Sequence, residues 1–133
     1  MRAFVIPSTI ALAALPAFAT AQSWKEIGRT ASKSIVLVDP KSIRRAGDTV
    51  TVTMRTRFAA ADGEGITGTR TIATFNCAKE QVAVKENDSY KGNRVVKRSI
   101  PKLPGYGVVF GGSLTGVAFA YLCPKKPGVA ADR

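Results

Sequence analysis

The chain has 133 residues, of which 45% are hydrophobic and 22% are charged, and 20 Lys and Arg against 9 Asp and Glu give a formal net charge of +11. It contains two cysteines and no histidine, which excludes Ser-His-Asp and Cys-His nucleophile systems and a tetrahedral zinc site built from the chain alone. Walker and dinucleotide-binding glycine patterns are also missing. We therefore expect a protein that is not an enzyme and holds no metal or cofactor.

The first 21 residues have the organisation of a secretory signal peptide. Met1-Arg2 gives a short positive start, residues 3–18 are almost wholly apolar, and Ala19-Thr20-Ala21 supplies small residues for a signal peptidase. We predict cleavage before Gln22, with cleavage after Ala19 as the second choice. An uncleaved membrane anchor is the less favoured alternative, because the apolar stretch is shorter than the ~20 residues that a span needs.

The expected mature protein is exported, periplasmic or secreted, with one domain over residues 22–124 and a disordered polar tail over residues 125–133. No cysteine lies near the cleavage region, so we expect no lipid anchor, and no further apolar segment is long enough to span a membrane. Loss of Arg2 with the leader lowers the charge from +11 by one, to +10. This excess favours anionic partners such as lipopolysaccharide, sulfated glycans or acidic proteins, and nucleic acid only without sequence specificity.

The two cysteines, Cys77 and Cys123, are an even pair in an expected oxidising compartment, which predicts one disulfide. The long loop that it would close is worth roughly 4 kcal/mol of stability in the chain-entropy description. Two free buried thiols are the alternative.

The first predicted strands lie on either side of a polar turn. Trp24 and Ile27 indicate a short edge strand or lead-in, and we expect the indole to pack onto the core rather than to stack on a sugar. Ser34–Val38 is a β-branched run that predicts a strand. Asp39-Pro40 ends this strand, and the carboxylate of Asp39 can accept hydrogen bonds from amides near Ser42.

The clearest pattern is the alternation over Thr49–Phe58. One side carries Val50, Val52, Met54, Thr56 and Phe58, and the other carries Thr51, Thr53, Arg55 and Arg57. This period of two predicts a strand with one dry and one wet face. A short strand at Ile43–Arg45 and a tight turn at Ala46-Gly47-Asp48 precede it, so the two strands should pair antiparallel.

The middle of the chain predicts three more strands. A glycine-rich hairpin loop at Ala59–Gly68 leads to a strand at Thr69–Asn76. Thr71, Ala73 and Phe75 share a face of this strand with Cys77, so we expect the cysteine to point inward. A strand at Gln81–Lys85 follows. Asn87-Asp88 then begins a turn region that ends at Gly92-Asn93, and Arg94–Ile100 is a further strand.

The last part of the chain is the hardest to predict. Residues 106–110 can form a short strand, and Ser113 can cap a helix because apolar residues up to Cys123 follow helical spacing. Gly116 and Val117 weaken this helix, and a final strand is the alternative. We predict an α+β, mainly β fold, with a single curved antiparallel sheet of about six strands, a C-terminal helix packed on one face and one disulfide.

Several short motifs occur in a fixed order: Trp24 at the mature start, Val38-Asp39 with Ser42-Ile43-Arg44 and Gly47, Phe75-Asn76-Cys77, and Ser113 ten positions before Cys123. In this order, over about residues 24–123, the chain resembles the surface-adhesin protein E family of Gram-negative bacteria. The resemblance implies an antiparallel sheet of about six strands curved against a helix. It also implies a binding role, in which members attach to host matrix or plasma proteins.

The candidate binding residues are basic side chains spread over the predicted strands: Arg55, Arg57, Arg70, Lys85, Lys91, Arg94, Lys97 and Arg98, with Tyr90 among them. Such a surface suits a sulfated or phosphorylated polymer, held mainly by charge, or a protein partner. A solvated sheet face that discourages edge aggregation is the alternative. The other functional hypotheses are a periplasmic accessory or structural envelope protein and an inhibitor of an exported enzyme acting through the Ala59–Gly68 loop.

Overall fold

The computed structural model describes residues 23–124. The predicted signal peptide and the predicted disordered tail lie outside these residues and stay predictions. The elements, in chain order, are β1 (Lys25–Arg29), β2 (Ile35–Val38), the 3-10 helix η1 (Pro40–Ser42), β3 (Arg44–Ala46), β4 (Thr49–Arg57), β5 (Gly68–Asn76), β6 (Gln81–Lys91), β7 (Arg94–Ser99), β8 (Gly107–Val108) and α1 (Leu114–Leu122).

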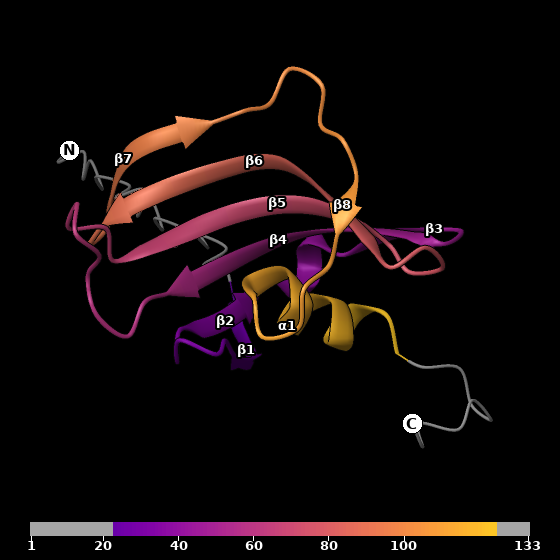
Figure 1. The fold of residues 1–133 in the computed structure, drawn as a ribbon, viewed down its shortest axis with the longest axis horizontal. Helices are drawn as coiled ribbons and strands as arrows, with labels where there is room; N and C mark the ends of the chain where they lie inside the picture. The colour runs from indigo at the N-terminus through magenta and orange to yellow at the C-terminus, as the bar shows by residue number, and fades with distance from the viewer. Residues whose placement is uncertain (1–22, 125–133) are drawn as a thin grey trace, which may run out of the picture.

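All strands of the described chain belong to one antiparallel sheet with the order β1-β2-β4-β5-β6-β7. The short strand β3 pairs with the start of β4, and β8 pairs with the start of β6. The sheet curls into a half-barrel whose concave side holds α1 (Figure 1). The predicted mainly β fold, with a curved sheet covered by a C-terminal helix, is therefore confirmed.

The corner between β2 and β4 is built as the sequence predicts. The backbone N–H of Lys41 donates to Asp39 Oδ1 at 3.1 Å, and the hydroxyl of Ser42 donates to the Asp39 carbonyl at 2.7 Å. The same hydroxyl accepts a hydrogen bond from the Thr53 amide at 2.9 Å. Asp39 thus has a structural role, because it ends β2 and ties the turn to the neighbouring strand.

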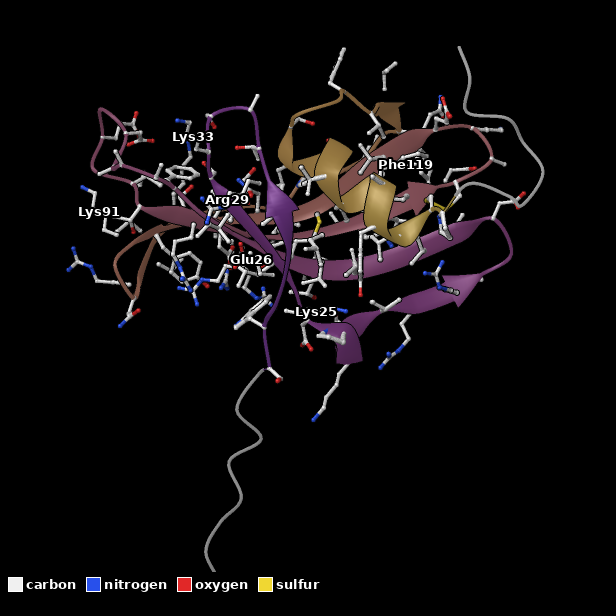
Figure 2. The ribbon with its side chains drawn as sticks, turned by 90° about the horizontal axis from the view of Figure 1, so that it is seen from below. Lys25, Glu26, Arg29, Lys33, Lys91 and Phe119 are labelled. Atoms are coloured by element: carbon white, nitrogen blue, oxygen red, sulfur yellow. A yellow bond between two sulfur atoms is a disulfide. The ribbon has the colours of Figure 1, made fainter. Side chains whose placement is uncertain are left out.

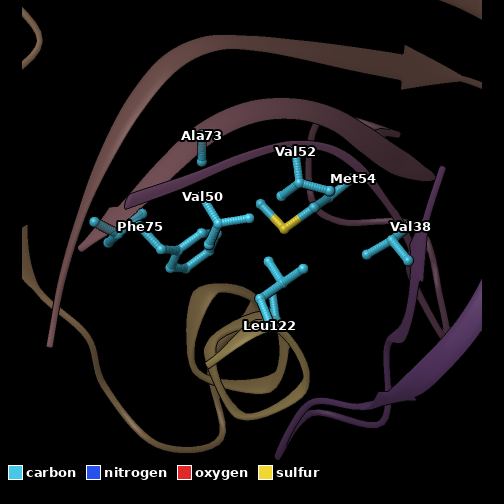
Figure 3. Close-up of a cluster of buried hydrophobic side chains, with 9 residues drawn as sticks. Val38, Val50, Val52, Met54, Ala73, Phe75 and Leu122 are labelled. Carbon is cyan, nitrogen blue, oxygen red and sulfur yellow. The ribbon is translucent and has the colours of Figure 1, made fainter. Parts of the chain in front are cut away.

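The hydrophobic core lies between the concave face of the sheet and α1. Figure 3 shows Val50, Val52 and Met54 from β4 directed toward Leu122 of the helix, with Phe75 from β5 beside them. The alternation predicted for β4 is confirmed over these positions. Trp24 is only partly buried and is not among the residues packed on this cluster, so the predicted packing of its indole onto the core is not confirmed.

Strand β6 is longer than predicted. Its expected end at Lys85 and the expected turn at Asn87-Asp88 are wrong, because the strand continues to Lys91. A β-bulge leaves Lys85 without a partner on β5, and beyond it Asn87 and Asp88 pair with both β5 and β7. Tertiary pairing therefore overrides the turn preference of Asn and Asp.

Helix α1 is confirmed, with Ser113 as its N-cap. The Gly116 amide donates to Ser113 Oγ at 3.1 Å. At the other end, Arg45 Nη1 donates to the Leu122 carbonyl at 2.9 Å, which satisfies a free carbonyl of the last turn. The Cys77–Cys123 disulfide is also confirmed, with its Cα atoms 5.4 Å apart. It joins the turn after β5 to the end of α1. None of the described helices has the length and apolar character of a membrane span.

Candidate anion-binding site

Charged side chains form a row across the face of the sheet that points away from α1. The strand register places Arg55 on β4 opposite Arg70 on β5, Arg70 opposite Asp88 on β6, and Asp88 opposite Arg98 on β7. Residues that are far apart in the sequence thus become cross-strand neighbours, which are close enough for their side chains to interact.

Asp88 neutralises part of this row. Its side chain is 1% exposed and accepts hydrogen bonds from Arg98, from Nε to Oδ1 at 3.0 Å and from Nη2 to Oδ2 at 3.3 Å. Arg70 Nη1 lies 3.8 Å from Oδ2, and Glu86 Oε1 lies 3.1 Å from Arg98 Nε. The pKa of Arg98 is raised above its ordinary value, mainly by the hydrogen bond with Asp88 and to a smaller extent by the negative charges of Asp88 and Glu86. Arg70 and Arg98 therefore have a structural role, because both pair with the buried Asp88 within the sheet.

Arg55 and Arg57 have a different environment. The guanidinium of Arg55 lies over the ring of Tyr90, 5.4 Å from its centroid, while Arg57 is exposed two residues further along β4. Together with the turn at Gly92-Asn93 they line a surface hollow of about 380 Å³. No carboxylate is found among the described residues that line it. We call this site the Arg55–Arg57 hollow.

The backbone around the hollow is held by specific contacts. The amide and the hydroxyl of Thr67 donate to the Tyr90 carbonyl at 2.8 and 3.3 Å, and the Gly92 amide donates to the same hydroxyl at 2.8 Å. At Gly68 an added Cβ would lie 2.4 Å from the Thr56 carbonyl oxygen. Glycine at this position therefore allows β4 and β5 to approach closely at the floor of the hollow.

The other predicted basic residues are distributed around this site or away from it. Lys91 and Arg94 pair across the turn between β6 and β7, at the end of the sheet remote from Phe119 on the helix (Figure 2). Lys97 lines a second hollow with Lys91, and that hollow also contains the carboxylates of Asp62 and Glu64. Lys85 is exposed at the bulge in β6.

The structure thus places Arg55 and Arg57 beside Tyr90 in a hollow whose described lining contains no carboxylate. Two guanidinium groups beside an aromatic ring can hold a sulfate, phosphate or carboxylate group, because each guanidinium offers paired donors and stays charged at every physiological pH. Sequence reasoning selected Arg55, Arg57 and Tyr90 but missed the pairing of Asp88 with Arg70 and Arg98. The sequence does not indicate this pairing, because the turn predicted at Asn87-Asp88 places Asp88 outside the strand.

Comparison with known proteins bears on strands β1 to β7. The family model described as surface-adhesin protein E matches residues 24–102, more than half of the chain. The chain belongs to the surface-adhesin protein E family. The family match spans β1 to β7, including the Arg55–Arg57 hollow, and ends before β8, α1 and Cys123, so it is shorter than the resemblance drawn from sequence motifs. No curated protein and no solved structure matches the chain significantly. Membership of the surface-adhesin protein E family indicates an adhesin-like surface protein.

Proposed function

We propose that this protein is an exported, non-enzymatic binding protein that uses the Arg55–Arg57 hollow to hold anionic groups of a polymer or of an acidic protein partner. The observation that carries the proposal is the juxtaposition of Arg55, Arg57 and Tyr90 in a hollow whose described lining has no carboxylate. The surface-adhesin family membership supports a binding role. An anionic polymer of the envelope or host matrix and an acidic protein surface present the same chemistry to this site.

The arrangement of charges restricts which basic residues can contribute. Arg70 and Arg98 already bind Asp88, and pulling them toward a ligand would leave a buried carboxylate without its partners. Arg55 is held against the Tyr90 ring and therefore loses less side-chain freedom when a ligand binds. Binding should thus depend on the hollow and the adjoining turn rather than on the total charge of the protein.

Heparin, a sulfated polymer, provides a direct probe. The exported protein and the double variant R55Q/R57Q are compared on a heparin column and by equilibrium binding at several salt concentrations. The control variant K41Q/K79Q removes the same two charges from exposed positions in η1 and in the turn after β5. Both variants therefore have the same net charge and differ only in where the charge is lost.

We expect R55Q/R57Q to bind heparin about tenfold to a hundredfold more weakly, because two charge-assisted hydrogen-bonding groups are lost. The salt dependence should also become shallower, by about one counterion for each lost contact. K41Q/K79Q should retain most of the affinity. Equal losses in the two variants would assign binding to net charge and refute the proposed site, and absence of heparin binding by the unaltered protein at low salt would refute charge-driven binding altogether.

A further inference from the structure

A protruding apolar segment connects β7 to α1 and is not explained by the core or by the Arg55–Arg57 hollow. We call residues 100–110 of this connection the apolar arm. Leu103 is 92% exposed, Ile100 64% and Phe110 69%, and Tyr106 and Val108 are also exposed. Figure 1 shows the first half of the arm rising beyond β7, on the side of the sheet away from α1. Exposed apolar side chains that gather in one short segment indicate a contact surface.

The chain segment that carries the arm bears charges of one sign, while carboxylates from other segments lie beside its first part: Glu86 and Asp88 pair with Arg98, and Asp62 and Glu64 line a hollow with Lys97. Between Ser89 and Pro124 the sequence contains Lys91, Arg94, Lys97, Arg98 and Lys102, and neither Asp nor Glu. Lys97 and Lys102 lie on either side of Ile100 and are exposed. A segment that combines exposed apolar side chains with the exposed Lys97 and Lys102 is complementary to a partner that offers hydrocarbon beneath a layer of negative charge.

The backbone of the arm is also suited to such a partner. Pro101 and Pro104 carry no N–H group, which reduces the number of polar backbone groups that lose water when the arm leaves the aqueous phase. The exposed side chains are spread along an extended connection that contains only the two-residue strand β8. They do not form a flat, continuous face, whereas a fluid lipid surface can adapt to separate side chains.

We propose that the apolar arm inserts into the interface of an anionic phospholipid bilayer, with Ile100 and Leu103 entering the acyl boundary and Lys97 and Lys102 contacting the headgroups. Tyr106 is placed for the interfacial region, because its ring is apolar and its hydroxyl is polar. The arm would hold the domain at the membrane surface by a contact that salt weakens. This inference rests on different residues from those of the Arg55–Arg57 hollow.

The test is sedimentation of the exported protein with phospholipid vesicles. Vesicles of phosphatidylcholine mixed with phosphatidylglycerol are compared with vesicles of phosphatidylcholine alone, and mass spectrometry verifies that all variants have the same N-terminus. I100S/L103S removes the apolar contacts and K97Q/K102Q removes the charges. K41Q/K79Q, which removes two exposed charges away from the arm and from the Arg55–Arg57 hollow, is the control for net charge. The single variant L103S, at a side chain 92% exposed, keeps the test valid if the double variant folds poorly.

We expect sedimentation with the mixed vesicles only. I100S/L103S should lower the partition coefficient roughly tenfold or more, and L103S should lower it by a smaller factor. K97Q/K102Q should lower it more than the charge control K41Q/K79Q does. A tryptophan introduced as L103W should shift its emission to the blue on binding and be quenched by brominated lipid. Absence of binding to mixed vesicles, or binding that L103S and I100S/L103S leave unchanged, would overturn the proposal. Self-association that L103S abolishes, without vesicle binding, would assign the arm to a second copy instead.

Discussion

The substitution Gly116→Ala distinguishes between helix propensity and packing, because the two predict changes of opposite sign in the free energy of unfolding. Alanine within a helix is favoured over glycine by about 1 kcal/mol. In this structure, however, a Cβ at position 116 would lie 2.1 Å from the Phe110 carbonyl oxygen and 3.1 Å from the Gly111 Cα. Since Cβ atoms do not approach other heavy atoms more closely than 3.0 Å, either the helix or the preceding loop must move by about 1 Å.

Neither partner is free to move. The Phe110 carbonyl accepts a hydrogen bond from Ser113 Oγ at 2.6 Å, and the Gly112 carbonyl accepts one from the Ala31 amide at 2.8 Å. The helix is fixed by the buried Leu122 and by the disulfide at Cys123. Overpacking of this kind costs about 1–3 kcal/mol, and disturbance of the N-cap adds about 1 kcal/mol. After the gain in propensity, Gly116→Ala should destabilise the fold by about 1–3 kcal/mol.

The assay is urea unfolding of the disulfide-intact protein, with thermal unfolding as a second measurement. The free energy of unfolding should fall by the amount above, and the midpoint temperature by roughly 5–15 °C. Gly105→Ala is the matched control, because its Cβ would meet no atom within 4 Å, and its effect should be within about 0.5 kcal/mol. A Gly116→Ala variant as stable as the unaltered protein, or more stable, would refute the packing argument.

Three further predictions concern the disulfide, the buried carboxylate and pH. Replacing Cys77 and Cys123 together by serine should cost roughly 4 kcal/mol, measured by urea unfolding; a loss below about 1 kcal/mol would show that the cross-link is dispensable. Asp88→Asn should lower the unfolding midpoint more than Glu86→Gln, since Asp88 is 1% exposed and accepts both hydrogen bonds from Arg98; the reverse order would contradict its central place in the row. Heparin affinity should stay constant between about pH 6 and pH 9, because arginine and lysine remain charged there and the chain has no histidine. A fall in heparin affinity within this range that exceeds the loss of the single α-amino charge would contradict an arginine site. The stability that Arg98 gives the sheet through Asp88 is present below its unfolded-state pKa and is lost only as the pH rises through its raised folded-state pKa.

Periodicity was sufficient to predict the centre of the fold. Val50, Val52 and Met54 could be placed in the core from sequence because an unbroken alternation assigns each residue to one face of a strand. The disulfide followed from cysteine number and the helix from its cap and spacing. These features depend on local pattern or on simple counting, and neither requires knowledge of which strands are neighbours.

The charge row and the structural need for Gly116 could not be predicted in the same way. A single bulged residue, Lys85, changes the register of β6, so the pairing of Asp88 with Arg70 and Arg98 emerges only when the sheet is assembled. Glycine at position 116 weakens the helix prediction made from sequence. In the structure, the absence of a side chain there leaves room for the Phe110 carbonyl group. Both effects arise from contacts between different segments of the chain, and no local sequence pattern shows that these segments are close in space.

The position of α1 has a consequence for how the chain acquires its structure. The sheet strands β1 to β7 are complete by residue 99, but their concave apolar face is closed only by residues 114–122. A chain that emerges from its N-terminus therefore keeps Val52, Met54 and Phe75 uncovered until residues 114–122 have also emerged. The Cys77–Cys123 disulfide forms later still, when an external thiol oxidant accepts the two electrons that the two thiols release. Arrest before this step would leave the concave face open and the chain prone to aggregation.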